Sequence, residues 1–167
     1  MNKNIINKIV KGLHEHVETV IVPNNTADRR PEYPYISYNL TGSQNNQTFS
    51  LVDEIVPSTN SNFENDVKVI RKEQPYFTLS INTHSDSEVD AYDLAVKVRD
   101  WFNFHGDLFF VELNIAVIRA TNVGDRTHQI VDDFERRYGF DVRIRAARSI
   151  VKRVETIEKH NFNATIN

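Results

Sequence analysis

The sequence predicts an α+β domain in which helices pack on one face of a mainly antiparallel sheet. Three observations support this prediction. Apolar residues recur at helical spacing over residues 4–17 and 91–102. Apolar and polar residues alternate over 35–41, 76–83 and 134–146, as they do in strands with one buried face. The order helix, strands, helix, strands shows no internal repeat, so we expect residues 1–167 to form a single domain.

The amino-acid composition of the chain excludes several classes of function. The chain contains no cysteine, which excludes thiol catalysis, thiolate zinc sites and disulfide-stapled folds. Its formal net charge of -3 is unfavourable for a protein whose main task is general nucleic-acid binding. No apolar run reaches the roughly 20 residues of a membrane span, and the N-terminus does not resemble a signal peptide. We therefore expect a soluble intracellular protein with no membrane partner.

The residue pattern of the N-terminal third predicts a helix, a loop and a strand. Ile5, Ile9 and Leu13 lie on one side of an amphipathic helix over 4–17. A polar turn follows, and the two prolines of the 29–35 segment impose an extended backbone before a strand begins. In that strand, over 35–41, the apolar side chains alternate with polar ones.

The middle of the chain predicts polar loops, a hairpin and a second helix. Residues 42–47 and 58–66 indicate exposed loops around a short extended piece. Residues 67–71 and 76–83, joined through 72–75, have the pattern of a hairpin. Ser85 and Glu88 have the spacing of a capping box for the helix that follows, which His105-Gly106 closes. Residues 108–118 indicate a turn and a buried strand.

The last third contains the longest alternating run. One face carries the apolar residues Phe134, Tyr138, Phe140, Val142, Ile144 and Ala146, and the other carries Glu135, Arg137, Asp141, Arg143 and Arg145. Residues 147–157 fit a helix as well as a strand, and we favour a strand that continues or turns back.

Motifs for catalysis are absent from the sequence. The six histidines include one close pair, His14 and His16, whose side chains diverge on a helix, so we expect no metal site. His84 next to Asp86 could orient an imidazole, but no nucleophile motif or phosphate-binding loop accompanies it. We therefore expect no catalytic residue and no cofactor.

One basic stripe needs an explanation: Arg136, Arg137, Arg143, Arg145, Arg148, Lys152 and Arg153. It is either a solvated strand face or a surface on which Arg143 and Arg145 meet acidic residues of a neighbouring subunit or passing nucleic acid. The aromatic residues of this strand lie on the opposite face, which disfavours base stacking.

Three stretches together resemble the neck or tail terminator proteins of tailed bacteriophages. They are Arg30-Pro31-Glu32-Tyr33-Pro34-Tyr35-Ile36-Ser37-Tyr38 after a first helix, the central helix Ala91–Phe104 after a polar Ser-Asp-Ser entry, and Asp125-Arg126 leading to Phe134-Glu135-Arg136-Arg137-Tyr138-Gly139-Phe140-Asp141-Val142. The resemblance covers residues 5–157, in order and at plausible spacing.

The resemblance implies a structural virion protein of the phage neck that is made in the host cytoplasm. Such subunits form a homo-oligomeric, hexameric ring that caps the head-proximal end of the tail tube and joins it to the head–tail connector proteins. DNA would pass through the ring without specific binding. The alternatives are a head-closure or tail-completion protein of the same joint, a nucleic-acid-binding accessory protein, and an enzyme.

Exposed sheet edges and proline-ordered loops suit the contacts between ring subunits. Within this resemblance, we expect those contacts in the loop 29–35 and the strand 135–145. The candidate residues are Arg29, Arg30, Pro31, Tyr33, Tyr35, Glu135, Arg137, Arg143 and Arg145. The alternative for the loop is that its prolines shape a turn while its tyrosines cover the core.

Overall fold

A computed structural model describes residues 3–24, 30–44, 48–130 and 133–155. The chain divides into two compact units. Unit 1 comprises residues 1–45 and 75–146, and unit 2 comprises residues 46–74 and 147–167. The expectation that the two units fold as one domain concerns cooperativity and stays a prediction.

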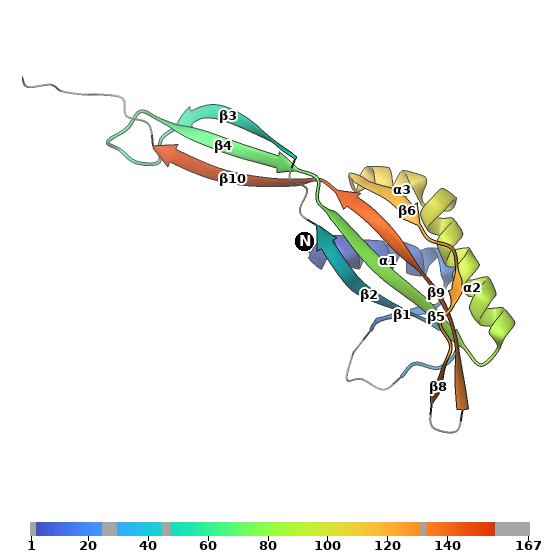
Figure 1. The fold of residues 1–167 in the computed structure, drawn as a ribbon. Helices are drawn as coiled ribbons and strands as arrows, with labels where there is room; N and C mark the ends of the chain where they lie inside the picture. The colour runs from blue at the N-terminus through green and yellow to red at the C-terminus, as the bar shows by residue number, and fades with distance from the viewer. Residues whose placement is uncertain (1–2, 25–29, 45–47, 131–132, 156–167) are drawn as a thin grey trace, which may run out of the picture. The chain divides into compact units, whose positions relative to one another are not determined.

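The helices of unit 1 cover one face of its sheet (Figure 1). They are α1 (Lys3–Val17), α2 (Glu88–Asp100), the π-helical turn η1 (Trp101–His105) and α3 (Asp107–Glu112). The amphipathic pattern of α1 predicted its buried side, since Ile9, Leu13 and Val17 lie in the core. No helix in the described ranges is long and apolar enough to cross a membrane.

The sheet of unit 1 has the order β1-β2-β5-β9-β6, and two short strands also pair with β9. Its strands are antiparallel neighbours except β1 and β2, which run parallel. The strands are β1 (Val20–Pro23), β2 (Tyr35–Gln44), β5 (Tyr76–Ser85), β6 (Ile115–Ala120), β7 (Gly124–Asp125), β8 (His128–Ile130) and β9 (Asp133–Ala146). The predicted class, α+β with helices on one face of a mainly antiparallel sheet, is confirmed for this unit.

The core of unit 1 lies between this sheet and the helices. Phe140, Val142 and Ile144 of β9 are fully buried there, as the alternation along the strand predicts. They pack in one cluster with the side chains of β5 and of α2, including Leu79 and Val98. Polar residues of the same strands consequently point to the opposite face, where the site described below is built.

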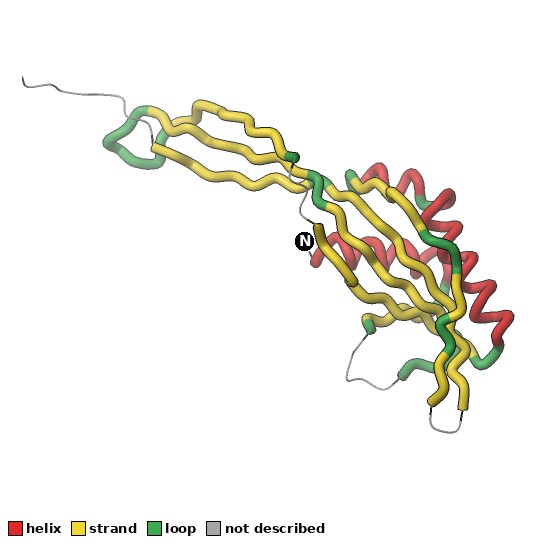
Figure 2. The backbone as a smooth tube through the Cα atoms, viewed as in Figure 1, coloured by secondary structure: helices red, strands yellow, loops and turns green. Residues whose placement is uncertain are grey.

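Unit 2 is a sheet of three strands in the described residues, in the order β10-β4-β3. The strands are β3 (Phe49–Pro57), β4 (Asn65–Glu73) and β10 (Arg148–Glu155). Figure 2 shows helices in unit 1 and strands and loops alone in the described part of unit 2. For residues 148–155 the strand prediction is confirmed and the helical alternative is wrong.

The predicted hairpin between residues 67–71 and 76–83 is wrong. β4 pairs with β3 and β10, whereas β5 pairs with β2 and β9. The connection Gln74-Pro75 therefore does not turn the chain back. It carries the chain from the sheet of unit 2 into the sheet of unit 1, and the pattern of two alternating segments could not distinguish these two outcomes.

Three local features also differ from the predictions. The helix cap is Ser87, whose side chain accepts from the Asp90 N–H, while the Ser85 hydroxyl accepts from the Ser87 N–H. The segment after Gly106 begins with α3 instead of a turn. A Cβ at Gly106 would lie 2.8 Å from the Phe110 ring, so glycine allows η1 and α3 to pack closely. The third difference is strand β1, which the sequence pattern did not predict.

Candidate interaction site

The face of the unit 1 sheet opposite the helices is polar, and we call it the polar face. Cross-strand pairing places its residues side by side: Tyr35 lies opposite His84, Ser37 opposite Asn82, and His84 opposite Arg137. Its members are Tyr35, Ser37 and Asn39 of β2, Thr78, Ser80, Asn82 and His84 of β5, and Glu135, Arg137, Asp141, Arg143 and Arg145 of β9.

Glu135 is the centre of a buried polar cluster on this face. The Tyr35 hydroxyl donates to Glu135 Oε1 at 2.8 Å, and the Arg30 guanidinium lies 3.4 Å from the same oxygen. His84 Nδ1 is 3.0 Å away. Because Glu135 comes from β9 and Arg30 from the segment before β2, the carboxylate ties that segment to the sheet.

Aromatic stacking reinforces this attachment. The Tyr35 ring stacks on His84 with centroids 4.3 Å apart and planes within 3°, and Tyr33 stacks on Tyr35 at 5.7 Å. Arg30 donates to the Tyr33 hydroxyl at 3.3 Å. Arg30 and Tyr33 are exposed at the outer end of the stack, whereas Tyr35 and Glu135 are buried. The cluster therefore presents an ordered arginine and tyrosine at the surface.

The pKa values of the cluster fix its charges at neutral pH. Burial lowers the pKa of His84 to about 4, against the attraction of the Glu135 carboxylate, so the imidazole is neutral. Burial alone would raise the pKa of Glu135, but the hydrogen bond from Tyr35 and the nearby His84 and Arg30 hold it below its ordinary value. Burial and the bond to Glu135 raise the pKa of Tyr35, so its hydroxyl keeps the proton it donates.

Ser37, His84 and Glu135 are the residue types of a serine hydrolase relay. Ser37 Oγ lies 2.8 Å from His84 Nε2. The serine, however, is only 3% exposed, and His84 Nδ1 does not meet the Glu135 oxygen at a hydrogen-bonding angle. A nucleophile needs access to its substrate and an aligned base. The arrangement therefore serves to hold the three strands β2, β5 and β9 together.

Sequence reasoning associated His84 with Asp86, and the structure places it against Glu135 instead. His84 belongs to β5 and Glu135 to β9, so no local spacing in the sequence connected them. Among the described residues, no group of three or more His, Asp or Glu side chains could hold a metal ion.

A second polar group on this face is centred on Arg126, which belongs to the resemblance but was not among the predicted contact residues. Its guanidinium donates to Ser80 Oγ at 2.8 Å, Asn82 Oδ1 at 3.0 Å and Asp141 Oδ1 at 3.1 Å. The arginine passes over Gly139, where a Cβ would lie 2.5 Å from the same Asn82 oxygen. Glycine therefore leaves the room that Arg126 needs to bridge β5 and β9.

The predicted contact residues fall into three groups. Arg30, Tyr33, Tyr35 and Glu135 come together in the cluster, and Pro31 lies in the same segment. Arg143 lies over the Tyr76 ring at 4.6 Å, and Arg137 and Arg145 share its strand face. Arg29 lies outside the described residues. The predicted basic stripe is divided, because Arg148, Lys152 and Arg153 belong to unit 2.

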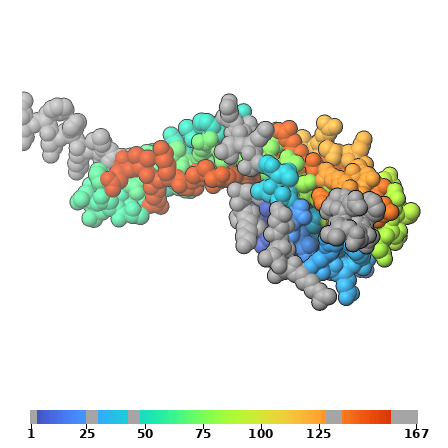
Figure 3. Space-filling view, turned by 60° about the horizontal axis from the view of Figure 1, so that its bottom comes forward, coloured from blue at the N-terminus to red at the C-terminus, as the bar shows by residue number. Residues whose placement is uncertain are grey.

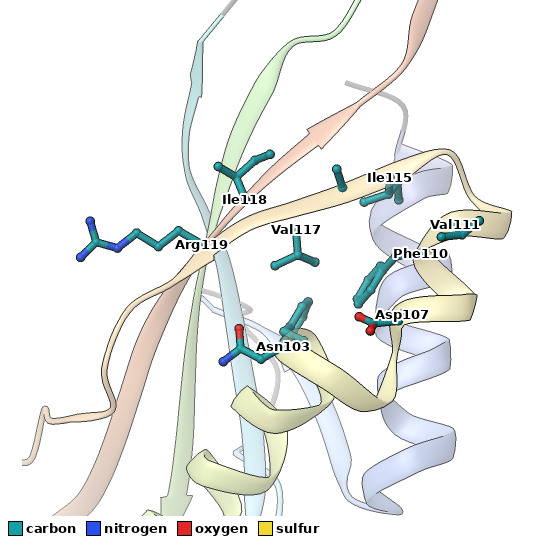
Figure 4. A pocket seen from close by; sticks show the side chains of 10 residues that line it. Asn103, Asp107, Phe110, Val111, Ile115, Val117, Ile118 and Arg119 are labelled. Carbon is teal, nitrogen blue, oxygen red and sulfur yellow. The ribbon is translucent and has the colours of Figure 1, made fainter.

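A pocket of about 440 Å³ opens between η1, α3 and β6 (Figure 4). Asn103 and Asp107 are the polar residues of a lining that is otherwise mostly apolar, and Arg119 extends away from the other labelled side chains. This lining offers no set of groups for acid–base or nucleophilic chemistry. Beside it, Phe104, Leu108 and Val111 are exposed at helical spacing and form an apolar stripe.

Unit 2 exposes more apolar surface on its two outer strands. The exposed large apolar residues are Phe49, Leu51, Val52 and Ile55 of β3 and Ile150, Val151 and Val154 of β10. Figure 3 shows atoms of the segments that contain β3 and β4 (teal to green) and β10 (red) at the surface of this unit. Apolar groups gathered in this way on a small sheet are typical of a protein–protein interaction site.

The chain matches the model of the phage neck terminator protein family over residues 7–167. No curated protein gives a significant match to the chain.

Proposed function

The chain belongs to the phage neck terminator protein family and is a structural component of the phage neck, and from this premise we propose that it caps the head-proximal end of a tail tube. In this proposal six copies form a closed ring. One surface of the ring meets the tail tube protein and the other forms the joining surface for the head–tail connector proteins.

The exposed apolar strands of unit 2 carry this proposal. A sheet of three strands is independently stable when one face packs on a core, and here apolar residues such as Leu51 and Ile55 are exposed instead. In an assembled neck, neighbouring subunits and partner proteins would cover them. The apolar stripe of Phe104, Leu108 and Val111 is a second surface of this kind.

The polar cluster of unit 1 supplies the second part of the contact surface. Arg30 and Tyr33 of the cluster are exposed, as is Arg143 elsewhere on the polar face, and all three would touch the neighbouring subunit. Tyr35 and Glu135 are buried, so they would hold the segment before β2 in place without direct contact. Ordered polar groups at an interface lose little conformational entropy on binding.

DNA would pass through the ring without specific binding. The net charge of -3 and the pairing of Arg126 with Asp141 both weaken the attraction of the polar face for phosphates. A mobility-shift assay at low salt tests this point: we expect no bound DNA, whereas binding that falls steeply with salt would favour a nucleic-acid-binding accessory protein.

The main experiment measures the mass of the purified chain by light scattering over a concentration series, followed by negative-stain imaging, alone and with tail tubes that lack their terminator. We expect rings of six subunits with an open centre, bound at one end of each tube. A chain that stays monomeric and leaves the tube ends free would contradict the proposed function.

A further inference from the structure

We propose that the unit 2 sheets of neighbouring copies join edge to edge, with β3 of one copy beside β10 of the next. This inference rests on the proposed ring and names the contact that builds it. In the described residues β3 and β10 each pair with β4 and form the two edges of the sheet. An edge strand presents unpaired backbone N–H and C=O groups that accept a further strand.

The strand directions allow this contact to repeat. β3 and β10 are both antiparallel to β4, so they run parallel to each other. A second copy placed beside the first in the same orientation therefore brings its β10 next to β3, with the two strands parallel and the same sheet faces aligned. Each copy then contacts one neighbour through its β3 edge and the other neighbour through its β10 edge.

The side chains of the two edges match over five consecutive levels, residues 51–55 of β3 and 150–154 of β10. β4 sets a common register, because each residue from Asp66 to Glu73 faces one residue of β3 and one of β10. At three levels both edges are apolar, and at two levels β3 is acidic where β10 is basic. The level pairs are Leu51 with Ile150, Val52 with Val151, Asp53 with Lys152, Glu54 with Arg153, and Ile55 with Val154.

The charge pair of Asp53 and Lys152 has the clearest need for a partner. Both side chains are exposed, and neither forms an ion pair within the described residues. Glu54 and Arg153 already have partners in their own copy, Lys68 at 2.8 Å and Asp66 at 3.7 Å. In the proposed contact Asp53 of one copy meets Lys152 of the next, and the neighbouring apolar residues exclude water around them.

The same charges disfavour the two-fold alternatives. Pairing β3 with β3 would bring Asp53 and Glu54 of two copies together, and pairing β10 with β10 would do the same for Lys152 and Arg153. Like charges opposite each other in a sheet are destabilising. A contact between different edges is heterologous, and a heterologous contact closes into a ring when its rotation allows.

The test exchanges the two charges. Asp53→Lys places two basic side chains at the level of residues 53 and 152, and Lys152→Glu places two acidic side chains there, so each single variant should lose the ring in light scattering and negative-stain images. The double variant carries the exchanged pair and should recover the ring. An equal mixture of the two single variants should also recover it, because basic and acidic copies can then alternate.

Matched controls place the same charge changes on exposed helix positions of unit 1, Asp93→Lys and Lys8→Glu, and should leave the ring intact. Circular dichroism and thermal unfolding check that every variant folds. Rings in the wild type and in both single variants would overturn the edge-to-edge contact and leave the proposed function standing. Loss of the ring in the single variants without its recovery in the double variant would also overturn the edge-to-edge contact. A wild type that forms no ring, alone or on tail tubes, would overturn both.

Discussion

The sheets of units 1 and 2 both consist mainly of antiparallel strands but differ in what covers them. In unit 1 helices cover one face, and Phe140 of β9 is 0% exposed. In unit 2 Ile55 of β3 is 79% exposed. The difference shows that apolar side chains on a strand form a core only where a second layer covers them.

The two units also differ in how they hold their buried acidic residues. Glu135 in unit 1 is held by a hydroxyl, an imidazole and an arginine on a well-packed face. In unit 2 Glu73 lies between Arg71 at 3.2 Å and Arg148 at 3.5 Å, both partly exposed, and Asp66 lies 3.7 Å from Arg153. Ion pairs with exposed partners contribute little stability, so unit 2 should gain less stability from its buried carboxylates than unit 1 does.

The largest effect should come from opening the unit 1 core. Phe140→Ala removes a fully buried ring between the sheet and the helices and should lower the free energy of unfolding by about 3–5 kcal/mol. Chemical denaturation measures this change in the free energy of unfolding. A loss below about 1 kcal/mol would show that this core is not the main source of stability.

Acid should weaken unit 1 through His84. Its pKa is 6.5 in the unfolded chain and about 4 in the fold, so between these values the unfolded state binds the proton more readily. The free energy of unfolding should therefore fall as pH drops from 6.5 to 4, by as much as roughly 2–3 kcal/mol. Below that range Glu135, whose folded pKa is also lowered, adds a further loss as it protonates.

His84→Gln is the matched variant for this pH dependence. It removes the titrating imidazole while Glu135, Arg137 and Arg30 remain around the position. Urea denaturation at several pH values should show a flatter profile between pH 6.5 and 4. An unchanged slope would assign the acid sensitivity to other groups.

A smaller loss should follow from Tyr35→Phe. The change keeps the ring that stacks on His84 and removes the hydroxyl that donates to Glu135. We expect about 1–2 kcal/mol of destabilisation, because a buried carboxylate loses a donor. Arg30 should also become less ordered. If stability were unchanged and the affinity between subunits fell, the Tyr35 hydroxyl would act at the interface and not in the fold.

The smallest effect on the isolated chain should come from Ile55→Thr in unit 2. The side chain is exposed and threonine keeps the β-branched shape, so the free energy of unfolding should change by less than about 0.5 kcal/mol. Ring formation should weaken because the residue lies on the proposed edge. A loss of stability comparable to that of Phe140→Ala would erase the contrast between the two units.

Local patterns were sufficient to predict α1, α2 and the inward faces of β2, β5 and β9, because each pattern spans neighbouring residues that share one environment. Pairing partners were not predictable in the same way. The pairing of β4 with β10 joins segments far apart in the chain, and nothing in their spacing excluded a hairpin with β5. The cluster of Ser37, His84 and Glu135 was missed for the same reason, since each residue comes from a different strand.

The ladder between β5 and β9 ends at Tyr76 and Arg145, and beyond it the Ala146 N–H donates to the Pro75 carbonyl at 3.3 Å. From these two points one chain segment leads into β4 and the other into β10. Joining such distant segments from an open chain costs loop-closure entropy, but the ladder has already brought them together. We therefore expect the long-range pairing of β4 with β10 to follow the formation of unit 1 and to cost little additional loop-closure entropy.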